Sequence, residues 1–178
     1  MKKHLFEKTT FTRMCITEAI ISLMKNTDFS KIRISAVVKR AGISRMTFYN
    51  YYDSLYSALS DYLNILINEY LHESENKPEI GSHLEHSRIV FSLHFFDKYR
   101  DYFLTLAKNN LHSILFDGIN QFMSRYIPAA KKYSEYQITC YSGGLLNTFL
   151  KWEQNGRQES CEDVATVIHK LYNSLNNS

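Results

Sequence analysis

Glycine and proline, the residues that most often interrupt helices, are scarce: six Gly and two Pro occur among 178 residues. Long stretches contain neither residue, which favours an all-α fold over one built from short strands and turns. The length suits one domain or two small ones, and it is sufficient to bury an apolar core.

Cysteine is also sparse. Cys15, Cys140 and Cys161 form no CxxC pair and no cluster of the metal-binding type, so we expect reduced thiols that act as small apolar side chains. His83 and His86 lie three residues apart, but no third ligand is specified. The sequence therefore predicts no metal and no cofactor.

The sequence also lacks the signals of membrane proteins, of secreted proteins and of common enzyme families. No run approaches the ~20 apolar residues of a membrane span, and no uninterrupted apolar stretch follows the basic segment 1–4. We therefore expect a cytoplasmic protein with no membrane partner. No GxSxG, HExxH or Gly-rich phosphate loop is present, so we expect no enzyme.

The charge is unevenly distributed. Residues 1–53 hold ten Lys or Arg against four Asp or Glu, a net charge of +6, whereas the other 125 residues hold eleven against fourteen, or −3. A basic front end on an acidic body indicates that the N-terminal third meets a polyanion; a solvated basic face is the alternative.

A helix-turn-helix pattern lies within this basic third. Apolar Ile34, Val37, Val38 and Ala41 have the spacing of one helix face. The following Gly42-Ile43-Ser44 joins a residue suited to a helix C-terminus to a good N-cap, so a second short helix is predicted from Arg45 to Tyr51.

Helical patterns also fill the rest of the chain. Residues 1–8 suggest a loose basic arm, and residues 74–82 and 129–134 suggest connections. Besides the two short helices, we predict helices over Thr10–Asn26, Ser54–Glu73, Leu84–Phe96, Tyr99–Asn109, Leu111–Ile127, Glu135–Gln154 and from Ser160 onward.

Residues 10–63 resemble the DNA-binding domain of TetR/AcrR-type bacterial transcriptional regulators. The resemblance lies in an amphipathic first helix, Phe29 after its end, VVKRAGIS, RMTFYNYYDS and a long fourth helix. It implies a three-helix helix-turn-helix domain over 1–53, joined by that long helix to a helical dimerisation and regulatory domain over 54–178.

The resemblance also implies which residues meet double-stranded operator DNA. Arg45, Met46 and Asn50 are expected to read bases in the major groove. Ser44, Thr47, Tyr49 and Tyr51 offer hydroxyls to phosphates, and Arg33, Lys39 and Arg40 add charge. Core packing is the alternative for Thr47, Tyr49 and Tyr51, and a solvated role for Lys39 and Arg40. Arg33 and Leu55 replace the Thr or Ser and the Lys that are common in the family, which leaves the phosphate contacts open.

Gly143-Gly144 lies inside a predicted helix, where each Gly costs ~1 kcal/mol relative to Ala. Close approach of a partner subunit's helix explains this cost, and a kink is the alternative. We predict a homodimer with a four-helix interface. The residues expected there are Gly143, Gly144, Leu145, Leu146, Phe149, Trp152, Val164, Ile168 and Leu171.

The expected function is a homodimeric, sequence-specific repressor controlled by a small-molecule effector. The phenylalanines of the middle of the chain (Phe91, Phe95, Phe96, Phe103, Phe116, Phe122) either line a pocket or form solid core. Alternatively, the chain has no ligand and is switched by a partner protein. The segment YSGGLLNTFLKWEQNG resembles a subgroup of these regulators that controls dihydroxyacetone metabolism. The sequence names neither the operator nor the effector.

Overall fold

A computed structural model describes residues 2–82, 84–126 and 133–176. This part of the chain is helical and contains no strand, which confirms the all-α prediction. The helices are α1 (Lys2–Met24), α2 (Ile34–Ala41), α3 (Arg45–Tyr49), α4 (Leu55–Glu75), α5 (His86–Asp97), α6 (Arg100–Lys108), α7 (His112–Tyr126), α8 (Glu135–Gln154) and α9 (Cys161–Asn176), with 3-10 turns η1 (Phe29–Lys31) and η2 (Pro78–Ile80).

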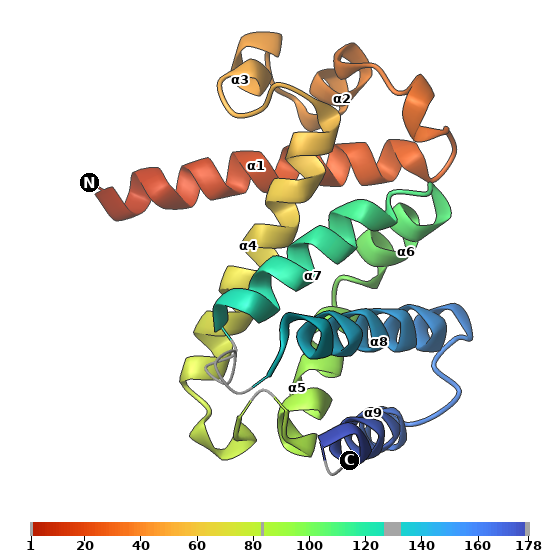
Figure 1. Cartoon of the computed structure of the whole chain (residues 1–178). Coiled ribbons are helices and arrows are strands. Elements are labelled where there is room, and N and C mark those ends of the chain that lie inside the picture. The colour runs from red at the N-terminus through yellow and green to blue at the C-terminus, as the bar shows by residue number, and fades with distance from the viewer. Residues whose placement is uncertain (1, 83, 127–132, 177–178) are drawn as a thin grey trace.

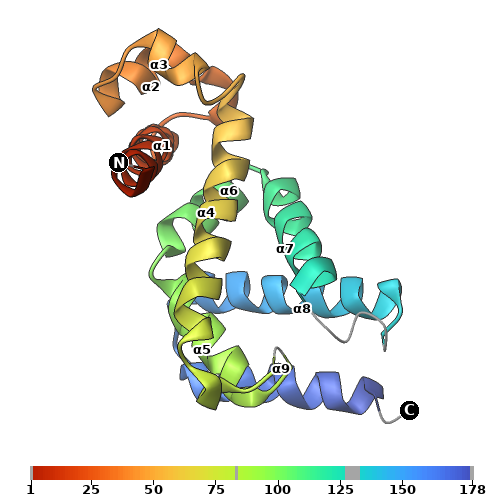
Figure 2. The same ribbon diagram turned by 90° about the vertical axis from the view of Figure 1, so that its left-hand side faces the viewer.

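Helix α4 runs between the two ends of the molecule (Figures 1 and 2). Its 21 residues span about 31 Å at 1.5 Å per residue. Helices α1, α2 and α3 surround its first half, whereas α5, α8 and α9 lie toward the other end. One continuous apolar core joins both ends, and Leu59 and Leu66 of α4 are fully buried in it.

The apolar faces predicted for the first helices are buried. Ile16 and Ile20 of α1 have no exposed surface, and neither has Val37 of α2. Helix α1 packs on α2 and α4, and also touches α6. The N-terminal helices are therefore held against the rest of the chain by apolar burial, which is the main favourable contribution to folding.

Serine side chains cap the first turns of several helices, at Ser54 as predicted and at Ser134, for which no cap was predicted. The Ser54 hydroxyl accepts a hydrogen bond from the Ser57 N–H (3.0 Å), and the Ser57 hydroxyl accepts one from the Ser54 N–H (3.2 Å). Ser134 and Gln137 make the same reciprocal pair at the start of α8. Such capping boxes satisfy backbone groups that a helix end would leave unpaired.

Several predicted boundaries are wrong: α4 ends at Glu75 rather than Glu73, and α5 begins at His86 rather than Leu84. Helix α1 starts at Lys2 rather than Thr10, because no Gly or Pro precedes Met24 to interrupt it. Helix α3 ends at Tyr49 rather than Tyr51. The predicted stop before Pro128 and most of the predicted connection 129–134 lie outside the described residues, as does His83.

A charged cluster holds α5, α6 and α8 together. Arg157 Nη1 donates to both carboxylate oxygens of Asp97 at 2.8 Å, and Arg100 Nε donates to Glu153 Oε2 at 3.1 Å. The Glu153 side chain has no exposed surface, and its Oε1 has no partner among the described residues. Burial, followed by the neighbouring Asp97, raises the pKa of Glu153 to about 7.

None of the helices in the described ranges is long and apolar enough to cross a membrane.

Candidate nucleic-acid interface

The turn between α2 and α3 has the backbone geometry that its sequence predicts. Gly42 adopts a left-handed conformation (φ 67°, ψ 32°), and its N–H donates to the carbonyl of Val38. Ser44 then caps α3, because its hydroxyl accepts a hydrogen bond from the Thr47 N–H at 2.9 Å. The two short helices are thus joined by a tight, glycine-containing turn of the kind found in helix-turn-helix motifs.

Two buried aromatic side chains hold α3 against the core. Phe48 is fully buried, Tyr52 is 6% exposed, and their ring centroids lie 6.0 Å apart in an edge-on arrangement. Because α3 has only five residues, its own hydrogen bonds contribute little stability, and this packing must hold it in place.

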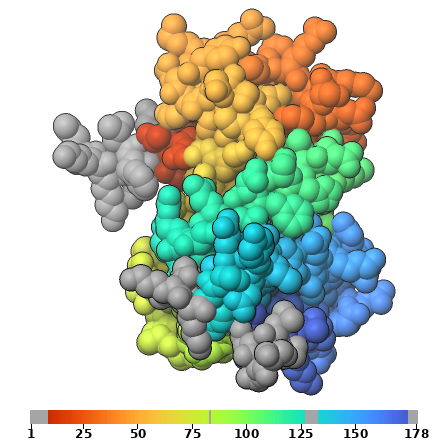
Figure 3. Space-filling view, viewed as in Figure 1, coloured from red at the N-terminus to blue at the C-terminus, as the bar shows by residue number. Residues whose placement is uncertain are grey.

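The opposite side of α3 is exposed at one end of the molecule, where α2 and α3 form the surface (orange in Figure 3). Met46 is 75% exposed, and Arg45 and Asn50 are also exposed. An exposed Met on a five-residue helix contributes little to the core. The three side chains predicted to read bases are therefore free to contact another molecule.

The predicted hydroxyl donors differ in availability. Tyr49 is 58% exposed and Tyr51 37%, so core packing does not account for either residue. The hydroxyls of Ser44 and Thr47 instead lie 2.9 Å apart and are hydrogen-bonded to each other. The two tyrosines are the more available hydroxyls.

Four exposed cations lie on α2, on α3 or directly before α2. Arg33, Lys39, Arg40 and Arg45 are all exposed, and none forms an ion pair within the described part of the chain. By contrast, Arg13, Lys25 and Lys31 of the same domain are each paired with a carboxylate. Among the described cations of residues 9–53, those without an ion pair all lie on α2, on α3 or directly before α2, where they can attract a polyanion.

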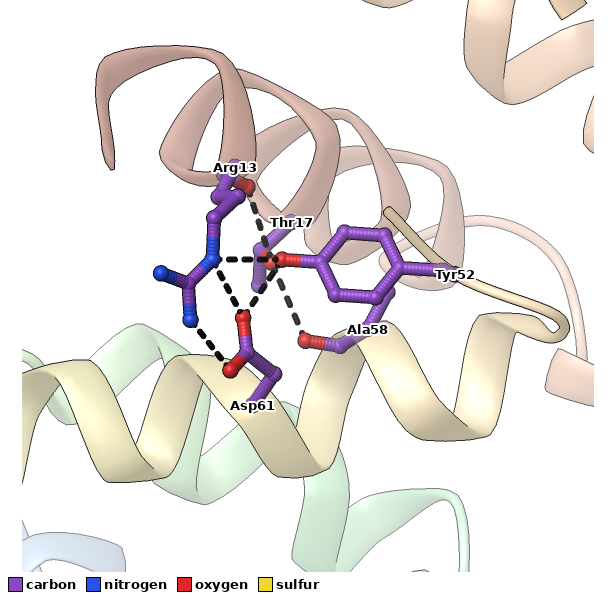
Figure 4. Close-up of polar contacts among 5 residues, drawn as sticks. All are labelled: Arg13, Thr17, Tyr52, Ala58 and Asp61. Atoms are coloured by element: carbon purple, nitrogen blue, oxygen red, sulfur yellow. Dashed lines mark hydrogen bonds and ion pairs between the residues drawn. The ribbon is translucent and has the colours of Figure 1, made fainter. Parts of the chain in front are cut away.

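A polar cluster that was not predicted from the sequence joins α1, α4 and Tyr52, which follows α3 (Figure 4). Asp61 of α4 accepts hydrogen bonds from the Tyr52 hydroxyl (Oδ2, 2.6 Å), from Arg13 Nε (Oδ2, 2.7 Å) and from Arg13 Nη2 (Oδ1). Burial and then the bond to Asp61 raise the pKa of Tyr52, and the bond to Asp61 raises that of Arg13. The signal in the sequence was weak: Arg13 and Asp61 each border an apolar stripe, but they are 48 residues apart.

The residues predicted for the dimer interface divide into two groups. Phe149, Trp152, Val164 and Ile168, together with Leu146, are buried in the protomer's own core. Gly144 and Leu171 are exposed, and Gly143 and Leu145 are half-buried. A Cβ at Gly144 would meet nothing within 4 Å, so no contact inside the protomer accounts for this glycine.

The exposed group belongs to an apolar face that α8 and α9 share. Tyr136 is 85% exposed, Val167 55% and Leu171 62%. Between the helices lies a groove of about 450 Å³, bordered by Cys140, Gly144 and Leu145 on one side and by Ile168 and Leu171 on the other. Tyr136 and Val167 were not among the residues predicted for the dimer interface, because their exposure depends on how α8 and α9 pack.

The phenylalanine-rich middle is mostly solid core with one small cavity. About 70 Å³ is free between α4, α5, α6, α7 and α8, bounded by Phe96, Phe103 and Phe122 among others. Polar groups are few in its wall: the hydroxyls of Tyr70 and Ser92 lie there, 2.9 Å apart and hydrogen-bonded to each other. An engineered cavity that binds benzene measures about 150 Å³, so this space holds only a few atoms as it stands.

Histidines form no metal site in the described ranges, where no group of three or more His, Cys, Asp or Glu is placed to hold an ion. The ring of His86 instead bonds to Thr166 of α9 (3.0 Å), and Nδ1 of His169 lies 3.1 Å from the carbonyl of Leu84.

Comparison with known proteins gives structural neighbours only. No protein-family model and no curated protein matches the chain. A structure assigned to a TetR-family transcriptional regulator of Syntrophomonas wolfei has a TM-score of 0.69 and 14% identity, over 95% of this chain and 96% of the other.

Two further structures agree over nearly the whole length. A TetR transcriptional regulator from Streptococcus agalactiae has a TM-score of 0.60 and 18% identity over 97% of this chain and 99% of the other. The dihydroxyacetone kinase operon activator DhaS has a TM-score of 0.58 and 17% identity over 92% and 95%. The chain has the fold of TetR-type transcriptional regulators, as the helix-turn-helix pattern predicted.

Proposed function

We propose that this chain is a transcriptional regulator that binds double-stranded DNA in a sequence-specific manner. One observation carries the proposal: three exposed side chains of α3 and its C-cap, which we call the reading edge (Arg45, Met46, Asn50), lie on a short helix fixed by buried aromatic side chains, and α2 and α3 carry exposed cations without ion pairs among the described residues. The fold shared with TetR-type regulators supports the same assignment.

The chemistry of the side chains indicates which residues read bases and which contact phosphates. A guanidinium can donate two hydrogen bonds to guanine O6 and N7, so Arg45 is the main base reader in this proposal. Tyr49, Tyr51, Lys39 and Arg40 contact phosphates, which positions α3 but reads no sequence. Arg33 serves the same electrostatic role from the start of α2.

Selection of bound fragments from a random DNA pool tests the proposal. We expect two related half-sites about one helical turn apart, and affinity that falls steeply as salt rises. Arg45→Ala should cost about 1–3 kcal/mol and relax the preference at one base pair, whereas Lys39→Ala should weaken all sequences alike. Arg125→Ala, which removes an exposed cation on α7, is the control. Absence of any preferred sequence contradicts the proposal.

We further propose a homodimer that joins through the apolar face of α8 and α9. Two-fold pairing of this face would cover Tyr136, Val167 and Leu171, and Gly144 would allow close helix approach. Light scattering should give twice the mass of one chain at micromolar concentration, and Val167→Glu should give the mass of one chain. Lys151→Glu, a charge change at an exposed position elsewhere on α8, should leave the dimer intact.

Two forms of control remain in competition. We favour a small apolar effector that enlarges the cavity beside Phe103, because the side chains that line this cavity are mostly apolar. The alternative is a partner protein without any ligand. Filling the cavity with Leu115→Phe should abolish an effector response and leave a partner response intact.

The direction of regulation belongs to the same proposal. We take it to be repression, although one structural neighbour is named an operon activator. A reporter gene behind a selected operator decides between them: repression predicts lower expression in the presence of this protein.

A further inference from the structure

The structure contains a polar cluster that the reading edge itself does not explain. We infer that Asp61 is a positioning residue for DNA binding: through Tyr52 and Arg13, its carboxylate fixes the orientation of α3 relative to α1 and α4. This inference rests on the proposed function, and it concerns how accurately α3 is held rather than which atoms touch DNA.

Tyr52 connects the recognition helix to Asp61. The residue lies three positions beyond the end of α3, and its N–H donates to the carbonyl of Phe48 at 3.0 Å. Its ring packs on Phe48, while its hydroxyl donates to Asp61 Oδ2 at 2.6 Å. The end of α3 is therefore fixed at two points, one apolar and one polar.

Arg13 brings α1 to the same carboxylate. Its Nε donates to Oδ2 at 2.7 Å and its Nη2 donates to Oδ1, so the guanidinium and the carboxylate pair through two hydrogen bonds. Both side chains are 25% exposed. Bidentate pairing restricts rotation as well as distance, which a single contact does not do. Alongside it, the Thr17 hydroxyl lies 3.3 Å from the carbonyl of Arg13 and 3.4 Å from that of Ala58.

Apolar packing alone does not define this orientation. Burial of Phe48 is non-directional, so α3 could rotate somewhat about the ring with little loss of buried area. Such a rotation would move Arg45, at the other end of α3, away from its base. Hydrogen bonds weaken steeply with angle, and readout of a base edge tolerates little misplacement. The directional bonds of Asp61 supply the missing constraint.

The test separates positioning from folding by measuring two affinities for each variant. One is the affinity for the selected operator, and the other is the affinity for a scrambled duplex of the same length. A variant that merely unfolds loses both in proportion, whereas a variant with a misoriented α3 loses the first and keeps the second, which is mainly electrostatic.

We expect Tyr52→Phe, which removes only the hydroxyl, to reduce the operator-to-scrambled ratio about tenfold, which corresponds to ~1.4 kcal/mol. Asp61→Asn should reduce the ratio further. Arg13→Lys, which keeps the charge, should retain more of it than Arg13→Met. The control is Asp101→Asn, which breaks the exposed Lys25–Asp101 ion pair between the end of α1 and α6 but touches nothing next to α3.

An unchanged ratio in both Tyr52→Phe and Asp61→Asn overturns the inference. If Asp61→Asn fails to fold, Tyr52→Phe alone decides, because the ring that fills the core is kept. The proposed function fails separately: in that case the wild-type protein itself shows no preference for any sequence over the scrambled duplex.

Discussion

Each half of the chain contains a charged cluster below its surface, and the two clusters differ in how well their carboxylates are satisfied. Beneath α3, Asp61 accepts three hydrogen bonds shared between its two oxygens. At the junction of α5, α6 and α8, Glu153 accepts one bond at Oε2, and its Oε1 has no partner in the described part of the chain. Yet Glu153 is the more deeply buried of the two.

The difference determines what each cluster can do. A carboxylate that receives several directional hydrogen bonds holds its neighbours in fixed geometry. At Glu153, burial and then the neighbouring Asp97 favour the protonated form and raise the pKa to about 7. The first cluster is therefore suited to a constant geometry, and the second to a response near neutral pH.

The largest expected effect comes from removing Asp61. Asp61→Ala leaves the half-buried guanidinium of Arg13 and the Tyr52 hydroxyl without their acceptor, so the free energy of unfolding should fall by about 3 kcal/mol. Urea denaturation measures it. The double variant Arg13→Met, Asp61→Ala should recover part of the loss, because no unpaired charge remains. If Asp61→Ala lowers the free energy of unfolding no more than Asp101→Asn does, the Arg13–Asp61 pair stabilises the protein no more than the exposed Lys25–Asp101 pair, and this prediction is wrong.

The second effect concerns pH and Glu153. Because the pKa in the folded state is raised from 4.5 to about 7, the contribution of this group is complete below pH 4.5 and is lost as pH rises through 7. The free energy of unfolding should thus fall between pH 5 and 8, with roughly 2 kcal/mol of the fall due to Glu153. In Glu153→Gln the share of the fall that is due to Glu153 should disappear. The variant should therefore be more stable than the wild type at pH 8.

The control for this experiment is Glu79→Gln, since Glu79 is an exposed carboxylate of η2 that forms no ion pair among the described residues. Its pH profile should match the wild type. Histidines titrate in the same range, so the quantity to compare is the difference between each variant and the wild type at the same pH. Parallel profiles for Glu153→Gln and the wild type would contradict the assignment.

The smallest expected effect comes from removing the serine of each capping box, one at the start of α4 and one at the start of α8. Ser54→Ala and Ser134→Ala should each lower the free energy of unfolding by about 1 kcal/mol, since each removes the acceptor for one N–H at a helix start. Only Ser54 lies between α3 and α4, so only Ser54→Ala should also weaken operator binding in a gel-shift titration. Equal binding by the two variants would show that the start of α4 does not influence the reading edge.

Local features were predictable from the sequence, because neighbouring residues determine them. Gly42 and Ser44 define the turn, and Ser54 and Ser160 begin helices where expected. The apolar spacing in α1 and α2 identified their buried faces correctly. These features specify the helix-turn-helix and the all-α fold.

Long-range features were not predictable. The Arg13–Asp61 and Arg100–Glu153 pairs join residues 48 and 53 positions apart, and nothing in a single sequence links such partners. Which apolar residues of α8 and α9 face outward depends on how these helices pack on α5, α6 and α7. For the same reason Phe149 and Trp152 were expected at an interface, although they are buried in the protomer.

The exposed edge of α3 also has a consequence for evolution. Arg45, Met46 and Asn50 contribute almost nothing to the core, so mutations there have little effect on folding. Duplicated copies of the gene could therefore acquire new target sites one substitution at a time, with no compensating change elsewhere. The residues beneath α3 lack this freedom, because Phe48, Tyr52 and Asp61 must change together or remain as they are.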